Sequence, residues 1–255
     1  MGANIRLRGA ALALLLGACM PAADKSAAAP AANHARGELG AKPQAGDHSG
    51  AAGEHEIIVA GAEPALLYVP ASYRREAPMP LLLMLHGAGG TARHSVDLAS
   101  RYADRFGFII LAPASRASTW DVIAGRAYGS DVAAIDAALA QSFAAYAVDR
   151  SRVAIGGFSD GASYALSLGL ANGELFGRIL AFSPGFVAPG RQAGRPQIFI
   201  SHGVADRVLP IEATSRRIVP RLRDAGYKVD YEEFRGGHIV PAELASRAFE
   251  SWVKD

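Results

Sequence analysis

The chain has 255 residues, half of them hydrophobic, and a formal net charge of +2 at pH 7. This length and apolar content suit one globular domain with a sizeable core. A net charge this small, with no long block of like charge, argues against nucleic acid as a partner.

The first residues predict an export signal. Arg6 and Arg8 form a basic start, and the apolar stretch GAALALLLGA then runs up to Cys19, the only cysteine. An apolar run this short is typical of a secretion signal and not of a membrane span. We therefore expect residues 1–18 to be a signal peptide and the protein to be exported. With a single cysteine, the domain must be stable without an internal disulfide.

The letters LGAC, which end at Cys19, resemble a bacterial lipobox. In signals of that kind the cysteine is lipidated and becomes the mature N-terminus, and several acyl chains hold a protein stably on a membrane. The resemblance implies a membrane-anchored lipoprotein, located in the outer membrane if the host is Gram-negative, because Met20 and not aspartate follows the cysteine. The alternative is an ordinary signal peptide cut nearby, which would leave a periplasmic or extracellular protein with a free thiol.

Residues 19–53 consist largely of Ala, Pro, Gly and polar residues. A segment with so few large apolar side chains cannot bury enough surface to fold. We expect it to be a flexible tether between the lipid and a domain that spans residues 54–255. His34 and His48 lie in this segment, and their scattered placement gives little support for a metal site.

From residue 55 onward, short apolar runs alternate with segments of helical periodicity. The expected strands are 55–61, 65–70, 81–87, 108–113, 152–157, 178–183, 196–203 and 228–234. The expected helices are 95–107, 130–147, one directly after Ser159, one over 211–222 that Pro220 should kink or split, and one opened by Pro241. The first two strands are expected to pair antiparallel, and the alternation of the others predicts a mostly parallel sheet with helices on both faces. Ligands of such sheets bind at the carboxyl ends of the strands.

Residues 157–161 read GFSDG, a G-x-S-x-G pattern between an expected strand and an expected helix. In a nucleophile elbow, this pattern places the serine on a strained turn that exposes its hydroxyl above the sheet. The glycines are needed because the strand and the helix pass too closely for side chains. Ser159 is therefore a candidate nucleophile, and the alternative is a glycine-rich turn with a capping serine.

A serine hydroxyl needs a base to act as a nucleophile, and the usual base is a histidine held by a carboxylate. His238 follows the last expected strand, and Asp206 follows the strand before it. The order Ser159, Asp206, His238 is the order in which triad members accompany a G-x-S-x-G elbow. Asp224 and Asp230 are rival carboxylates, but they fall late in a helix and within a strand.

Two other histidines, His86 and His202, each precede a glycine at the end of a strand. We interpret both as structural residues that anchor loops through hydrogen bonds. The alternative is a metal site that they would form with His238. The chain has no ligand spacing such as H-E-x-x-H to support that alternative.

From about residue 55 to its end, the chain resembles the α/β-hydrolase superfamily, and within it the esterases of the phospholipase/carboxylesterase and polyhydroxybutyrate-depolymerase-like groups. The stretches that carry the resemblance are LHGAGG (85–90), STWDV (118–122), GGFSDGAS (156–163), HGVADRVLP (202–210) and GGHIVP (236–241). The resemblance implies the α/β-hydrolase fold. It also implies an oxyanion hole formed by the backbone N–H groups of Ala88 and Asp160.

Three further features bear on the pocket. Trp120 follows a strand and either packs in the core or lines the pocket. The carboxylate of Asp160 is expected to cap the N-terminus of the helix that follows Ser159, where negative charge is favoured. The link over 184–195 is too short and too polar for a helical lid, which favours an open site and small or extended soluble esters over lipids at an interface.

Together these residues predict a serine carboxylesterase that works through an acyl-enzyme, with Ser159 as nucleophile, His238 as base and Asp206 as its orienting carboxylate. This chemistry requires no metal and no organic cofactor. The alternatives on the same triad are a polyester or feruloyl-type esterase, a thioesterase and a peptidase. The alternative from another class is a non-catalytic surface lipoprotein that keeps the fold as a binding module.

Overall fold

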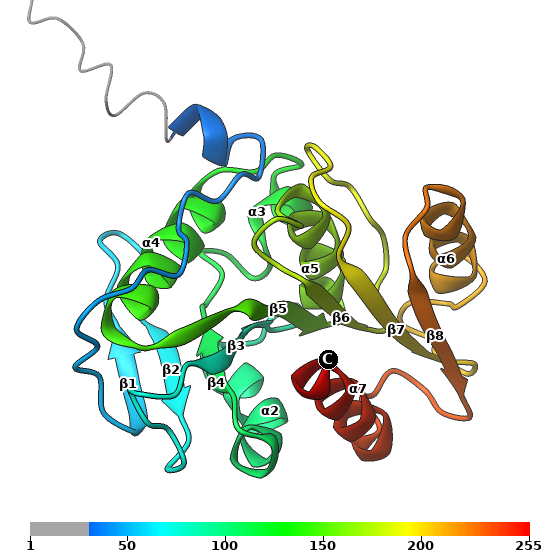
Figure 1. Cartoon of the computed structure of the whole chain (residues 1–255). Coiled ribbons are helices and arrows are strands. Elements are labelled where there is room, and N and C mark those ends of the chain that lie inside the picture. The colour runs from blue at the N-terminus through cyan, green and yellow to red at the C-terminus, as the bar shows by residue number, and fades with distance from the viewer. Residues whose placement is uncertain (1–30) are drawn as a thin grey trace, which may run out of the picture.

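The computed structural model describes residues 31–255, so the predicted signal peptide and the lipid site at Cys19 lie outside the described residues. One eight-stranded sheet organises the chain, in the order β1-β2-β4-β3-β5-β6-β7-β8 (Figure 1). The strands are β1 Gly53–Ile57, β2 Ala65–Val69, β3 Met79–Leu85, β4 Ile109–Ala112, β5 Val148–Phe158, β6 Arg178–Phe182, β7 Gln197–Gly203 and β8 Val229–Phe234. The helices are α2 Ala92–Phe106, α3 Asp121–Ala124, α4 Ser130–Ala145, α5 Asp160–Ala171, α6 Ser215–Asp224 and α7 Ala242–Lys254.

Strand direction follows the expected pattern. β1 pairs antiparallel with β2, and β2 pairs antiparallel with β4. Every pair from β4 across β3, β5, β6 and β7 to β8 is parallel. The predicted mostly parallel sheet with an antiparallel start is therefore confirmed.

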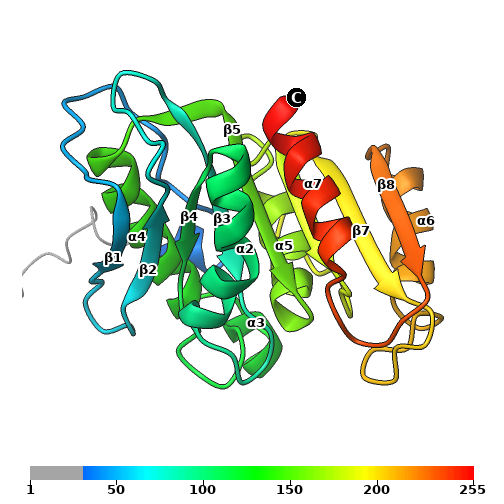
Figure 2. The same ribbon diagram turned by 90° about the horizontal axis from the view of Figure 1, so that it is seen from below.

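Two apolar cores lie on the two faces of the sheet, because successive side chains of a strand point to opposite faces. Along β3, Leu81, Leu83 and Leu85 belong to the core under α4, α5 and α6. Leu82 and Met84 belong to the core under α2 and α7. Figure 2 shows α2 and α7 side by side on one face of the sheet, with α5 and α6 behind it. The sequence signal for this arrangement is the unbroken apolar run of β3.

The segment over residues 31–52, which we call the N-terminal strap, does not behave as the predicted flexible tether. Leu39 is buried, with 6% of its surface exposed. The side chain of Asn172 accepts a hydrogen bond from the Leu39 N–H at 2.9 Å and donates one to the Gly37 carbonyl at 2.7 Å. On α4, the Asp136 carboxylate accepts hydrogen bonds from the Gly40 and Ala41 N–H groups and lies 2.9 Å from His34 Nε2.

The prediction of flexibility was wrong for residues 31–52 because it considered only apolar burial. One buried leucine and hydrogen bonds to Asp136 on α4 and to Asn172 directly after α5 hold the strap on the domain. Figure 1 shows the strap as the blue trace that passes α4. His34 is engaged by Asp136 and has no metal-binding arrangement around it within residues 31–255.

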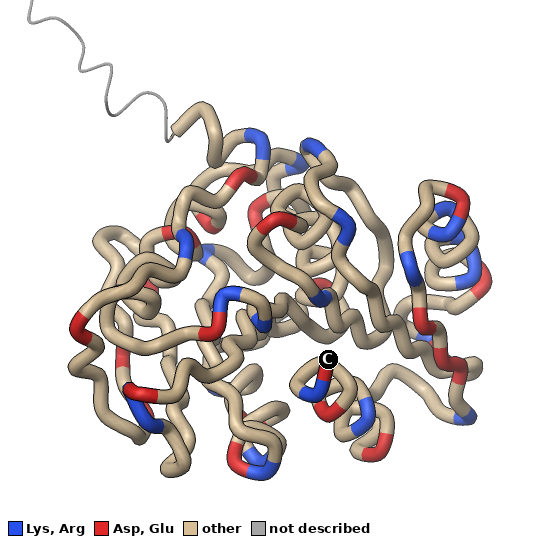
Figure 3. Tube along the Cα trace, viewed as in Figure 1, with Lys and Arg blue, Asp and Glu red and all other residues tan. Residues whose placement is uncertain are grey.

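Two remaining features concern helices. Pro220 lies inside α6 and does not split it, and the helix begins at Ser215, four residues later than expected. Within the part of the chain that the structure describes, no helix combines the length and the apolarity needed to span a membrane. Over residues 31–255, both acidic and basic positions are spread along the trace (Figure 3).

Candidate active site

Ser159 occupies a tight turn between β5 and α5, as the G-x-S-x-G pattern predicted. Its backbone has φ 58° and ψ −122°, a conformation that costs a non-glycine residue about 1–3 kcal/mol. A Cβ on Gly157 would lie 2.4 Å from the carbonyl carbon of Gly161. A Cβ on Gly161 would lie 2.2 Å from the carbonyl oxygen of Leu85 at the end of β3. Glycine is therefore required at both positions, and the turn has the geometry of a nucleophile elbow.

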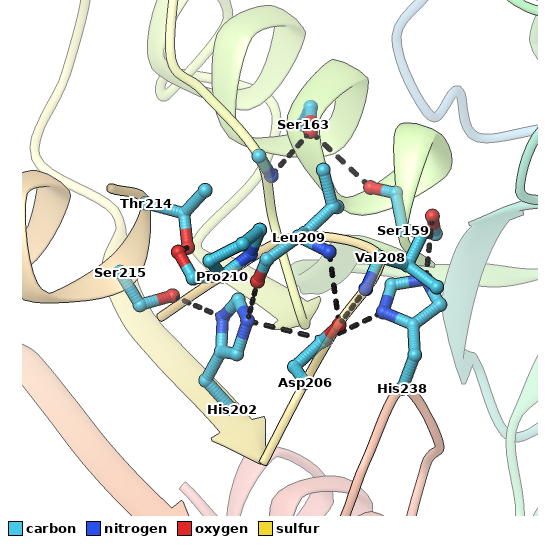
Figure 4. Close-up of polar contacts among 11 residues, drawn as sticks. Ser159, Ser163, His202, Asp206, Val208, Leu209, Pro210, Thr214, Ser215 and His238 are labelled. Atoms are coloured by element: carbon cyan, nitrogen blue, oxygen red, sulfur yellow. Dashed lines mark hydrogen bonds and ion pairs between the residues drawn. The ribbon is translucent and has the colours of Figure 1, made fainter. Parts of the chain in front are cut away.

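The three candidate triad residues meet at the carboxyl ends of β5, β7 and β8 (Figure 4). Ser159 Oγ lies 2.8 Å from His238 Nε2, and His238 Nδ1 lies 2.6 Å from Asp206 Oδ2. In the neutral imidazole, Nδ1–H donates to the carboxylate and Nε2 accepts from the serine hydroxyl. This is the arrangement in which a histidine can take the serine proton. Of the two rival carboxylates, Asp224 ends α6 and Asp230 lies within β8. Neither belongs to this hydrogen-bonded group.

Both carboxylate oxygens of Asp206 are engaged in hydrogen bonds. Its Oδ1 accepts hydrogen bonds from the N–H groups of Val208 and Leu209, each at 2.9 Å. Burial raises the pKa of this carboxyl, but the hydrogen bonds from Leu209, His238 and Val208 outweigh it, and the net pKa is lowered from its ordinary value. Asp206 is therefore ionised at neutral pH and can stabilise a charged His238.

His202 supports the loop that carries Asp206, as expected for a structural histidine. Its Nε2–H donates to the Leu209 carbonyl at 2.8 Å, and its Nδ1 accepts from the Ser215 hydroxyl at 2.7 Å. The ring also lies 3.3 Å from Asp206 Oδ2. Burial lowers the pKa of His202, which keeps the ring neutral, and the geometry agrees with that state.

His86 and Trp120 form a second support, beneath the loop that follows β3. His86 Nδ1–H donates to the Gly87 carbonyl at 2.8 Å, and its Nε2 accepts the Ser115 N–H at 3.0 Å. The indole N–H of Trp120 donates to the His86 carbonyl at 2.9 Å, and its ring stacks on Tyr164. Burial lowers the pKa of His86, so the ring is neutral.

Trp120 has no exposed surface. The alternative that Trp120 lines the substrate pocket is therefore wrong, and the core interpretation holds. Because His86 and His202 use both ring nitrogens in hydrogen bonds, neither is available as a ligand in the metal site considered with His238. Within residues 31–255, no group of three or more His, Cys, Asp or Glu side chains is placed to hold a metal ion.

The two expected oxyanion donors lie next to the serine. A Cβ on Gly87 would be 3.3 Å from Ser159 Cβ, so the loop that carries Ala88 abuts the elbow. Asp160 is the first residue of α5, where helical N–H groups have no partner within the helix. Among the hydrogen bonds of residues 31–255, neither the Ala88 nor the Asp160 N–H has a protein acceptor. Both donors are thus free to bind a developing oxyanion.

Residues 115–120, which we call the clamp loop, hold both sides of this candidate oxyanion site, a role that the sequence pattern did not predict. Thr119 Oγ1 donates to Asp160 Oδ2 at 2.6 Å. The Ser118 carbonyl accepts the Gly89 N–H at 2.6 Å. The carboxylate of Asp160 lies in the first turn of α5 without making a capping hydrogen bond, so the expected cap is replaced by the contact with Thr119. The available signal was the STWDV stretch, which contains Thr119 but does not reveal its distant partner Asp160.

Within residues 31–255, the link between β6 and β7 does not form a helical lid. The link over residues 184–195 contains no helix and is fastened to α5. Ser163 Oγ accepts the Gly185 N–H at 2.8 Å, and Ser167 Oγ accepts the Ala188 N–H at 2.9 Å. A cavity of about 480 Å³, the His238 cavity, opens beside the histidine. Its apolar lining comes from Leu98, Phe158, Ile239 and Val240.

Comparison with known sequences agrees with this geometry. A model of the Phospholipase/Carboxylesterase family matches residues 126–248. A probable feruloyl esterase C of Aspergillus flavus is 28% identical over 156 residues, which cover 58% of this chain and 56% of that relative. The chain thus spans little more than half the length of this curated relative.

Comparison with solved structures gives the same fold. The crystal structure of esterase PE8 matches with a TM-score of 0.60 and 25% identity, over 74% of this chain and 96% of that chain. A CE1 ferulic acid esterase from Anaeromyces mucronatus, solved with ferulic acid, matches with a TM-score of 0.56 and 16% identity, over 83% of this chain and 92% of that chain. The second likeness concerns the fold alone. Together, the matches confirm the α/β-hydrolase fold and support the expectation of a carboxylic ester hydrolase.

Proposed function

We propose that this chain, an α/β-hydrolase similar to the phospholipase/carboxylesterase group, is a serine carboxylesterase that works through an acyl-enzyme on Ser159. The observation that carries the proposal is the hydrogen-bonded series from Ser159 Oγ to His238 Nε2 at 2.8 Å and from His238 Nδ1 to Asp206 Oδ2 at 2.6 Å. A strained elbow and two unengaged N–H groups beside it complete the requirements of acyl transfer.

The proposed reaction has two halves. His238 takes the proton of Ser159 as the hydroxyl oxygen attacks the acyl carbonyl, and the N–H groups of Ala88 and Asp160 bind the resulting oxyanion. Each such donor contributes about 3 kcal/mol of transition-state stabilisation. The alcohol leaves with the proton from His238. A water molecule then attacks the acyl-enzyme, with His238 again as the base, and the acid is released as Ser159 regains its proton. Asp206 holds the imidazole in the required tautomer throughout.

A feruloyl-type ester is the second candidate substrate. It is favoured by the match to a probable feruloyl esterase and by the apolar lining of the His238 cavity. The ring of Phe158 lies 4.7 Å from that of His238, so an apolar aromatic surface borders the reacting atoms. A lidless site suits an acyl group carried by an extended alcohol, and it does not suit triglyceride droplets.

Hydrolysis of p-nitrophenyl esters from acetate to long-chain, together with methyl ferulate, tests the proposal. We expect cleavage of short-chain or aromatic esters, its loss in Ser159→Ala, and labelling of the wild-type serine by a fluorophosphonate. No cleavage of any ester and no labelling of the folded protein would support the non-catalytic binding module instead. Strong activation by an oil surface would contradict the open, lidless site.

We also propose that Cys19 carries a lipid that anchors the exported protein to a membrane. The proposal comes from the basic start, the short apolar run and the LGAC letters. Expression with a labelled fatty acid tests it, and we expect label and membrane fractionation in the wild type but not in Cys19→Ser. Unlabelled protein in the soluble exported fraction would favour an ordinary signal peptide.

A further inference from the structure

The clamp loop is tied at both of its ends by one buried side chain, the carboxylate of Asp131. Asp131 is the second residue of α4, and 2% of its surface is exposed. Its Oδ1 accepts the Arg116 N–H at 3.0 Å, and its Oδ2 accepts the Asp121 N–H at 2.8 Å. One carboxylate thus bridges a residue near the start of the clamp loop and the residue directly after its end.

The residues of the clamp loop that contact the candidate oxyanion site lie between these two points. The Ser118 carbonyl accepts the N–H of Gly89, the residue after Ala88, at 2.6 Å. Thr119 Oγ1 donates to Asp160 Oδ2, also at 2.6 Å. Because both ends of this short segment are bound to the same side chain, Ser118 and Thr119 are held in place from outside the site. Groups that must be placed precisely for chemistry depend on support of this kind.

A second carboxylate, that of Asp121, holds Asp131 in turn. Asp121 Oδ2 accepts the N–H groups of Gly129 at 2.8 Å and of Asp131 at 3.0 Å. Asp121 Oδ1 accepts the Tyr164 hydroxyl at 2.8 Å. Asp121 begins α3, which lies beside α5 (Figure 1), and Tyr164 belongs to α5. The two aspartates therefore accept each other's backbone N–H groups and join the clamp loop to both α4 and α5.

Aspartate is the residue type that this arrangement requires. Each oxygen of Asp131 accepts a different N–H group, whereas an asparagine has only one acceptor oxygen. The pKa of Asp131 is raised, first by burial and then by the charge of Asp121, although the N–H groups of Arg116 and Asp121 lower it. Burying a carboxylate beside another carboxylate costs free energy. The two hydrogen bonds to the clamp loop give a physical reason for that cost.

We propose that Asp131 is a positioning residue of the esterase and that, by fixing both ends of the clamp loop, it holds the N–H groups of Ala88 and Asp160 in place for the oxyanion. Asp131 acts through Ser118 and Thr119 and not on the reacting atoms themselves. This inference rests on the proposed function and adds a residue, outside the triad and the oxyanion donors, on which the rate of acyl transfer depends.

Asp131→Ala tests the proposal, with the purified full chain in detergent and the p-nitrophenyl ester that the wild type cleaves fastest. The variant removes both acceptors, so both ends of the clamp loop are released. We expect kcat to fall about 30-fold with KM changed less than about twofold, because the oxyanion donors act mainly in the transition state. Asp131→Asn keeps the side-chain volume and one acceptor, and it should lower kcat about tenfold. It decides the question if Asp131→Ala does not fold.

Asp136→Ala is the matched control on the same helix. Asp136 also accepts two backbone N–H groups from a distant segment, those of Gly40 and Ala41 in the strap. Urea denaturation should show a lower free energy of unfolding for this variant, whereas kcat should stay within about twofold of the wild type. A general loosening of α4 would instead lower kcat in both variants alike.

Combination with Thr119→Val shows whether Asp131 acts through the clamp loop. In the wild type, Thr119→Val removes a hydrogen bond that holds Asp160 in place. In Asp131→Ala the loop is already released, so adding Thr119→Val should lower kcat by less than about threefold further. Independent effects would multiply, whereas effects that pass through one shared network do not. A purely structural role for Asp131 would not produce this coupling.

The outcomes separate the two proposals. If the wild type cleaves no ester and is not labelled by a fluorophosphonate, the proposed function fails, and this inference fails with it. The function stands and the positioning role is overturned if the wild type is active but the folded Asp131 variants keep kcat within about threefold. The same conclusion follows if Asp136→Ala loses as much activity as Asp131→Ala, or if the losses from Asp131→Ala and Thr119→Val simply multiply.

Discussion

The two sides of the candidate active site are built differently. On the elbow side, Ser159 and the oxyanion donors rest on the buried residues His86 and Trp120 and on the clamp loop. On the base side, His238 follows Gly236 and Gly237 in a loop, and the next residue, Ile239, is 54% exposed. The elbow side is a packed network with many contacts, whereas the base side is a loop fixed at a few points.

This difference indicates which contacts hold the candidate catalytic groups in position on each side. The proposed nucleophile and oxyanion donors are fixed by backbone sterics, since a Cβ on Gly161 would collide with the carbonyl oxygens of Leu85 and His86 at the end of β3. The base is oriented chiefly by one carboxylate, Asp206, and by the ring of Phe158. We therefore expect single substitutions to be most damaging to activity on the base side and most damaging to folding on the elbow side.

Among the residues that support the proposed nucleophile and base, Asp206 should show the largest effect on activity when it is changed to Asn. The amide keeps the shape of the carboxylate but favours the wrong tautomer of His238 and cannot stabilise its charged form. We expect kcat to fall about 10⁴-fold, as for the equivalent change in serine proteases, while the protein stays folded. Steady-state kinetics with circular dichroism measures both quantities. A loss below tenfold would show that another group orients the base.

On the elbow side, Gly161→Ala should lower both stability and activity through a steric clash. The new Cβ would lie 2.2 Å from the Leu85 carbonyl oxygen and 2.5 Å from that of His86, so the strand end or the helix must move. We expect the free energy of unfolding to fall by about 3 kcal/mol and kcat to fall about 10²-fold, because the oxyanion loop shifts. Urea denaturation and kinetics measure the two effects. Gly46→Ala is the control, since a Cβ there meets nothing within 4 Å.

A smaller effect on the same side should follow from Thr119→Val. This change keeps the volume but removes the hydrogen bond that holds Asp160, whose N–H is a proposed oxyanion donor. We expect kcat to fall about tenfold with little change in KM, because the positioning matters most in the transition state. Thr119→Ser should restore the rate. An equal loss in both variants would assign the effect to packing and not to the hydrogen bond.

The sheet and the candidate triad could be predicted from the sequence because short-range patterns along the chain encode them. Strand ends and glycine-rich turns are encoded by neighbouring residues, and a parallel sheet brings its strand ends together. The clamp and the strap were missed because their contacts are distant in sequence. Thr119 and Asp160 are 41 residues apart, and Leu39 and Asn172 are 133 apart. A polar side chain in a sequence does not reveal a partner at such a distance.

The smallest predicted effect is a loss of folding stability at acid pH. Burial lowers the pKa of His86 on the elbow side and of His202 on the base side. The unfolded chain takes up these protons near the ordinary histidine pKa of about 6.5, and the folded chain does so only at lower pH. Stability is therefore fully present above about pH 6.5 and falls as the pH drops through the folded values. For Asp206, whose folded pKa is lowered, stability is lost only at more acid pH, as the carboxylate is protonated.

Urea denaturation at pH 7.5 and pH 5.5 separates the two sides. We expect the free energy of unfolding to fall by about 1 kcal/mol between these values, since one unit of pKa shift corresponds to 1.36 kcal/mol. In His86→Asn, whose side-chain amide can still donate to the Gly87 carbonyl, part of this fall should disappear, because the elbow side no longer titrates. His48→Asn is the control, since His48 lies near the surface with a single 3.4 Å hydrogen bond to Ala144. If His86→Asn keeps the full fall, the acid-sensitive part of the domain is the base side, where His202 holds the Asp206 loop.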